Sequence, residues 1–141
     1  MIVHAAWKRF ILLLLMIASL MVVALFIYLQ IRKPDSYAID TPVEISPPLA
    51  RTELEKGALL LDVREQNEYD QEHIAGSKLI PLGDLPARLG EIPNDRLIIV
   101  MCRSGARSVR GRDTLLAAGF AHVTSMQGGI QSWMASGFPV E

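Results

Sequence analysis

The chain has 141 residues, half of them hydrophobic, and a formal net charge of −1 at neutral pH. This length suits a single domain, and the single cysteine excludes both an intrachain disulfide and a zinc site built from several cysteines. All 15 acidic residues lie at or after Asp35, as do 10 of the 14 Lys and Arg residues, so the part after Lys33 carries a charge of −5. An acidic domain argues against general nucleic-acid binding.

The hydrophobic residues are concentrated near the N-terminus, where residues 10–29 contain no charged side chain. About twenty helical residues cross the hydrocarbon core of a bilayer, so we predict a transmembrane helix over residues 10–31, after a tail over residues 1–9. A cleaved signal peptide is the alternative, but its apolar core is shorter. The resulting expectation is a single-pass protein of a bacterial inner membrane. The positive-inside rule weakly favours a periplasmic domain.

A linker with several prolines is predicted over residues 32–43, before a domain over residues 44–141. Within the domain, short apolar runs typical of buried strands alternate with segments that suit helices. Strands are expected over residues 58–63, 78–81, 97–101 and 122–126, and helices over residues 47–56, 65–72, 85–89, 106–118 and 130–136. This alternation indicates an α/β domain in which the strands pair in parallel and helices cover both faces of the sheet.

The lone cysteine, Cys102, follows a predicted buried strand and precedes a predicted helix. Ligands of open α/β sheets bind at the carboxyl ends of the strands, and the N–H groups at the start of a helix attract anions. Gly105 lets the backbone turn, while Arg103 and Arg107 add positive charge, so the loop favours the reactive thiolate. The alternative is a small hydrophobic residue buried at a strand end. The arginines, serines and glycine that follow favour the reactive cysteine.

Short motifs occur in a fixed order along the domain. They are residues 60–65 (LLDVRE), Glu68-Tyr69, residues 73–77 (HIAGS), residues 80–82 (IPL), residues 102–108 (CRSGARS), Gly119-Phe120, residues 128–130 (GGI) with Trp133, and residues 137–140 (GFPV). As an ordered set they resemble the single-domain rhodanese sulfurtransferases, over about residues 44–141.

The resemblance implies a three-layer α/β domain with a mostly parallel five-stranded sheet, and the activity of a thiosulfate sulfurtransferase. The catalytic Cys102 thiolate would take sulfane sulfur from a small anionic donor such as thiosulfate. The resulting persulfide would pass its sulfur to cyanide or a cellular thiol. The implied substrate-binding residues are Arg103, Ser104, Gly105, Ala106, Arg107 and Ser108. No metal and no cofactor are implied, and a protein partner is left open.

Two other functions stay open at this point. One is a rhodanese-like binding or persulfide-carrier module without turnover, against which the intact Cys102 argues. The other is a cysteine phosphatase or arsenate reductase, whose loop resembles this one but is longer by one residue. Here four residues lie between Cys102 and Arg107, Met101 precedes the cysteine, and Ser108 stands where the phosphatase arginine would fall.

Other polar residues are given structural roles. We expect Asp62 and Arg64 to form a buried pair that holds loops together, because buried charges are normally paired. His73 is expected to make a structural hydrogen bond, because a thiolate stabilised by its loop needs no general base. The histidines His4, His73 and His122 lack the spacing of metal ligands.

Overall fold

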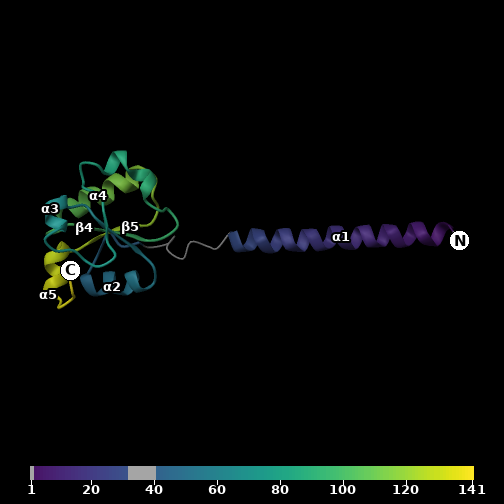
Figure 1. Cartoon of the computed structure of the whole chain (residues 1–141), viewed down its shortest axis with the longest axis horizontal. Coiled ribbons are helices and arrows are strands. Elements are labelled where there is room, and N and C mark those ends of the chain that lie inside the picture. Colours follow the sequence, from purple (N-terminus) through teal and green to yellow (C-terminus); the bar gives the residue numbers. More distant parts are fainter. Residues whose placement is uncertain (1, 32–40) are drawn as a thin grey trace. The chain divides into compact units, whose positions relative to one another are not determined.

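A computed structural model describes residues 2–31 and 41–141; within its first helix it describes the side chains of residue 11 and residues 14–28. The chain divides into two compact units, Met1–Ser36 and Tyr37–Glu141. The first unit is the helix α1, Ile2–Ile31 (Figure 1). It begins within the segment that was expected to be an N-terminal tail over residues 1–9. Most of the linker predicted over residues 32–43 lies outside the described residues.

The structure does not support the transmembrane helix expected over residues 10–31. In the part of the chain that the structure describes, no helix was found to be long and apolar enough to cross a membrane.

The second unit contains a five-stranded sheet in the order β1-β5-β4-β2-β3, and all of its strand pairs are parallel. Its strands are β1 (Glu44–Ile45), β2 (Leu59–Asp62), β3 (Lys78–Leu79), β4 (Ile98–Met101) and β5 (Val123–Met126). The expected parallel α/β fold with five strands is therefore confirmed. The spacing of apolar residues did not predict β1, because two residues are too few to show a period.

Helices cover both faces of this sheet (Figure 1). The helices α2 (Pro47–Glu55) and α5 (Gly129–Ala135) lie on one face, and α4 (Ala106–Ala117) lies on the other. The remaining helical segments are α3 (Gln66–Tyr69) and two short 3-10 turns, η1 (Leu85–Ala87) and η2 (Leu89–Glu91). The expected helix over residues 65–72 is thus only four residues long.

The two faces of the sheet are packed by alternate residues of the central strand. Ile99 and Met101 belong to the core beneath α2 and α5, whereas Ile98 and Val100 belong to the core beneath α4. This alternation follows from the two-residue period of a strand. It places the next residue, Cys102, on the face that α4 covers.

The predicted structural role of Asp62 and Arg64 is confirmed. Both side chains are almost completely buried, and Arg64 Nη2 lies 2.6 Å from Asp62 Oδ2. The same Nη2 donates to the carbonyl oxygen of Glu72 at 2.9 Å, and Arg64 Nη1 reaches the carbonyl oxygen of Glu68 at 3.5 Å. The pair therefore fixes the segment after α3 against the carboxyl end of β2.

Candidate active site

The candidate site is built where β4 ends and α4 begins. Cys102 follows directly after β4, and its side chain is buried, with 1% of the residue exposed. Gly105 precedes the first residue of α4 and has a φ of +106°, a conformation that a side chain would disfavour. Its positive φ turns the chain from the strand into the helix within three residues. The expectation that Gly105 lets the backbone turn is therefore confirmed.

The main-chain amides of this turn surround the cysteine sulfur. Gly105 N–H donates to Cys102 Sγ over an N···S distance of 3.1 Å. The first hydrogen bond of α4 runs from Val109 N–H to the carbonyl oxygen of Gly105 at 3.1 Å. Because the first N–H groups of a helix have no partner within the helix, those of the loop stay free to face an anion. The site therefore suits a negatively charged sulfur.

The balance of burial and hydrogen bonding lowers the pKa of the Cys102 thiol. Burial raises the pKa, but hydrogen bonding from the Ser108 side chain and from the amides of Gly105, Ser108 and Ser104 outweighs it. The hydroxyl of Ser108 is completely buried and makes no well-formed hydrogen bond within the described chain. We interpret it as a donor that lies close enough to the sulfur to stabilise its charge. The Ser108 hydroxyl and the amides therefore both lower the pKa of the Cys102 thiol.

The two arginines of the loop are placed differently from each other. Arg107 makes two short contacts with Glu68 of α3, Nη1 to Oε2 at 2.6 Å and Nη2 to Oε1 at 2.7 Å. This hydrogen bonding by Arg107 lowers the pKa of Glu68 to about 2, and Glu68 raises the pKa of Arg107. Arg103 is exposed and forms no ion pair within residues 41–141. The sequence had suggested that the guanidinium of Arg107 is free to bind an anion. In the structure it is paired with Glu68 and joins α4 to α3.

A segment far along the sequence supports the loop from behind. Ile130 N–H donates to the carbonyl oxygen of Cys102 at 2.8 Å, and Gln131 N–H donates to that of Arg103 at 3.2 Å. Gly129 has a φ of +60°, and a Cβ atom built there would overlap the carbonyl oxygen of Cys102. No site role was expected for Gly129 from the sequence. Its place in the GGI motif was the only signal available.

The loop also contains Ser104 and Ala106, which are both exposed beside the cysteine. The seven residues that the sequence assigned to the site therefore lie in the loop of residues 102–105 and in the first turn of α4. His73 lies in a different place: its Nδ1 is 3.1 Å from the carbonyl oxygen of Tyr69, and its ring stacks on Tyr69. Its expected structural hydrogen bond is confirmed. The described residues contain no cluster of side chains that could hold a metal ion.

Comparisons with known proteins agree on one family. Residues 46–136 match the family model for the rhodanese-like domain. The chain is 38% identical over 96 residues to a sulfurtransferase of Allochromatium vinosum, which covers 68% of this chain and 87% of that protein. It is 31% identical over 115 residues to the chloroplastic thiosulfate sulfurtransferase 16 of Arabidopsis thaliana, covering 71% of this chain and 93% of that protein. Two other curated relatives are matched over a smaller share of their own length, 60% of one and 24% of the other.

The solved structures point to the same fold. A rhodanese-related protein from Thermoplasma volcanium is 31% identical and superposes with a TM-score of 0.66. That match covers 71% of this chain and 98% of the solved one.

The contact behind the loop can be tested with a matched pair of glycine variants. Gly129→Ala forces a Cβ atom against the Cys102 carbonyl, whereas at Gly137, where φ is +78°, a Cβ atom meets nothing within 4 Å. Both variants carry the strain of a positive φ, so that strain largely cancels in the comparison. We expect Gly129→Ala to lower the free energy of unfolding by about 1–3 kcal/mol more than Gly137→Ala. Urea unfolding measures the difference, and equal losses would contradict the contact.

The role of Ser108 can be tested through the pH dependence of alkylation. Iodoacetamide reacts with the thiolate, so the rate at Cys102 rises as the pH passes through the pKa of its thiol. Because the Ser108 side chain lowers that pKa, Ser108→Ala is expected to move the midpoint of the rate profile to higher pH. The control is Thr124→Val, which removes another buried hydroxyl without a well-formed hydrogen bond. A profile unchanged by Ser108→Ala, or moved equally by both variants, would exclude this role.

Proposed function

The chain belongs to the rhodanese-like domain family, and from this premise we propose that it is a sulfurtransferase that uses thiosulfate as a sulfur donor. The observation that carries the proposal is the bond from Gly105 N–H to Cys102 Sγ, with the lowered pKa of that thiol. Nucleophilic catalysis by cysteine requires an activated thiolate. The names of two similar proteins, a sulfurtransferase and a thiosulfate sulfurtransferase, agree with this activity.

In the proposed first step the Cys102 thiolate attacks the outer sulfur of thiosulfate. The new S–S bond joins Cys102 to that sulfur, the old S–S bond breaks, and its electron pair leaves with sulfite. The negative charge of the thiolate then resides on the outer sulfur of the Cys102 persulfide. Preorganised donors stabilise such charge most when water is excluded. The amides of residues 104–108 and the Ser108 hydroxyl are the donors that we assign to this task.

The two arginines receive separate roles in this proposal. Arg103 is exposed beside Cys102, so we assign it to attracting the anionic donor. Arg107 is held by both carboxylate oxygens of Glu68, and we assign it to positioning the loop and to adding positive potential near the sulfur. This assignment differs from the sequence-based one, in which Arg107 binds the anion directly.

The two rival functions have less support. The short interval between Cys102 and Arg107 argues against a phosphatase or arsenate reductase, because a tetrahedral oxyanion needs a wider loop. A binding module without turnover would have no need to lower the pKa of Cys102. A persulfide carrier shares the first step with the enzyme and differs only in how the sulfur leaves.

The proposal is tested by treating the full-length chain with thiosulfate and measuring its intact mass. We expect a gain of one sulfur atom, reversed by cyanide, and no gain in Cys102→Ser, which keeps the size of the side chain. Absence of the added sulfur in the wild type would contradict the proposal. Hydrolysis of an aryl phosphate in place of sulfur uptake would instead support the phosphatase.

We also propose, from the sequence alone, that residues 10–31 hold the chain in a membrane with the domain on the periplasmic side. Residues 10–29 carry no charge, as a segment within the hydrocarbon core requires. In a bacterial host, the wild type is expected to stay in the membrane pellet after alkaline carbonate extraction. The double variant Leu20→Arg/Val23→Arg is expected in the soluble fraction, because each arginine opposes insertion by about 2.5–3.5 kcal/mol. Wild-type protein in the soluble fraction would contradict the proposal.

A further inference from the structure

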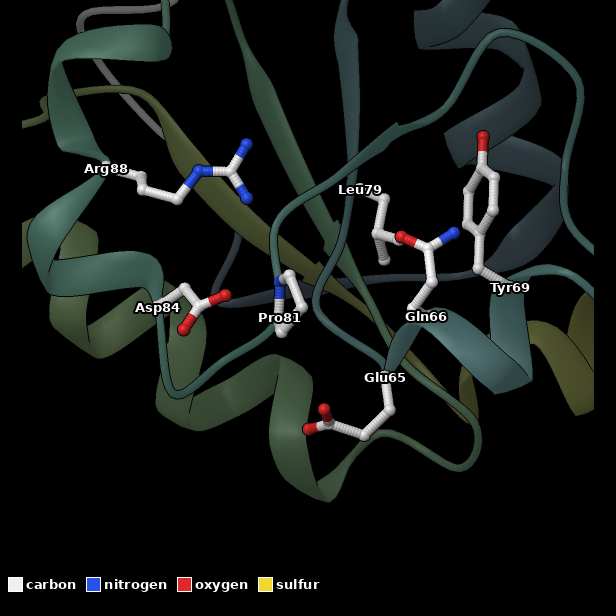
Figure 2. Close-up of a pocket in the computed structure, with 7 residues that line it drawn as sticks. All are labelled: Glu65, Gln66, Tyr69, Leu79, Pro81, Asp84 and Arg88. Atoms are coloured by element: carbon white, nitrogen blue, oxygen red, sulfur yellow. The ribbon is translucent and has the colours of Figure 1, made fainter.

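Residues of α3 and its flanking loops line two pockets. One is shown in Figure 2, where Arg88 and Asp84 lie on one side and Glu65 and Gln66 on the other. The charges of that pocket are largely satisfied: Arg88 is bonded twice to Glu91, at 2.7 and 2.9 Å, and Glu65 takes part in the capping box of α3. It therefore offers no free basic group to a ligand.

The second pocket adjoins the active loop. Arg103 of that loop, Gln131 of α5, and Glu68 and Glu72 are among the residues that line it. Gln131 N–H donates to the carbonyl oxygen of Arg103, and Glu68 is paired with Arg107, so two of the lining residues are bonded to the segment that contains Cys102. A molecule in this pocket would lie next to the residue that follows the reactive sulfur.

Two of the four charges that line this pocket are already neutralised, and two are not. Arg64 is paired with Asp62, and Glu68 is paired with Arg107. The other two, Glu72 and Arg103, form no ion pair with each other or with any side chain in the described domain. The pocket thus presents one unpaired carboxylate and one unpaired guanidinium.

Among the lining residues of the pocket there is a further donor. Arg64 lines it although only 2% of the residue is exposed. Its Nη1 reaches the carbonyl oxygen of Glu68 at 3.5 Å, the limit of a hydrogen bond. A buried guanidinium nitrogen with so weak a contact retains capacity to donate to a polar ligand.

We propose that this pocket binds the sulfur acceptor, and that the acceptor is a small thiol bearing both an ammonium and a carboxylate group, as an amino-acid thiol does. The ammonium pairs with Glu72 and the carboxylate with Arg103, which leaves the thiol beside Cys102. This inference rests on the proposed sulfurtransferase function and narrows its acceptor. Two unpaired charges of opposite sign that line one pocket are complementary to a zwitterion and not to an ion of a single sign.

The transfer step follows from this placement. The acceptor sulfur attacks the outer sulfur of the Cys102 persulfide, and a new S–S bond forms between them. The bond between Cys102 and the outer sulfur breaks, and its electron pair returns to Cys102 as the thiolate. The proton of the acceptor thiol moves to the transferred sulfur, so the products are the acceptor persulfide and the free Cys102 thiolate.

The experiment loads the full-length chain with thiosulfate, removes the excess, and measures discharge of the persulfide by four thiols. Cysteine carries both charges, cysteamine only the ammonium, 3-mercaptopropionate only the carboxylate, and 2-mercaptoethanol neither. Each variant is compared with the wild type on the same thiol, so that differences in thiol reactivity cancel. We expect Glu72→Gln to slow discharge by cysteine and cysteamine about fivefold, as for an exposed ion pair, and to leave the other two thiols unchanged.

The matching expectation for Arg103→Gln is slower discharge by cysteine and 3-mercaptopropionate, with cysteamine unchanged. Controls are Asp70→Asn and Arg110→Gln, which remove one charge from exposed positions outside the pocket and should alter none of the four rates. Full sulfur loading of Glu72→Gln, and its discharge by cyanide at the wild-type rate, show that the variant is folded.

If a variant slowed discharge by all four thiols equally, or slowed discharge by none of them, the acceptor proposal would be overturned. In that case sulfur uptake by the wild type and its removal by cyanide would still support the sulfurtransferase function. Absence of sulfur uptake would overturn the function itself, and the acceptor proposal with it.

Discussion

The negative charge of the Cys102 sulfur must be held where almost no water reaches it, because only 1% of the residue is exposed. An unpaired buried charge is costly, so this requirement constrains the whole loop. The structure meets it with the Ser108 side chain, the bond from Gly105 N–H at 3.1 Å, and the amides of Ser108 and Ser104, which together outweigh the effect of burial on the pKa of the Cys102 thiol. The short turn from β4 into α4, made possible by the positive φ of Gly105, is what directs these amides at one atom.

The loop keeps this shape because two distant parts of the chain hold it. Ile130 and Gln131 of α5 donate to the carbonyl oxygens of Cys102 and Arg103, so these two acceptors of the loop backbone are hydrogen-bonded as well. The Glu68–Arg107 ion pair joins α4 to α3, and the buried pair of Asp62 and Arg64 fixes the segment that follows α3. The shape of the site thus rests on contacts within the protein and needs no ligand, as preorganised electrostatic stabilisation requires.

Sequence patterns predicted the strands and the turn, which depend on residues close together in the chain. They missed the contacts between residues that are far apart in the chain. The apolar runs placed β2, β4 and β5, and the residues after Cys102 indicated an anion-binding turn. The partner of Arg107 lies 39 residues away, and no local pattern links it to Glu68, so the arginine was assigned to the substrate. The close approach of Gly129 to the Cys102 carbonyl is likewise visible only once the sheet has brought α5 behind the loop.

The most direct measurement of the central claim is an experimental structure of the chain after treatment with thiosulfate. The account predicts a second sulfur atom bonded to Cys102 Sγ and lying within hydrogen-bond distance of the N–H groups of residues 104–108, with the loop backbone unchanged. Absence of an added sulfur on Cys102, or an added sulfur out of reach of those N–H groups because they are bonded to other groups, would contradict it.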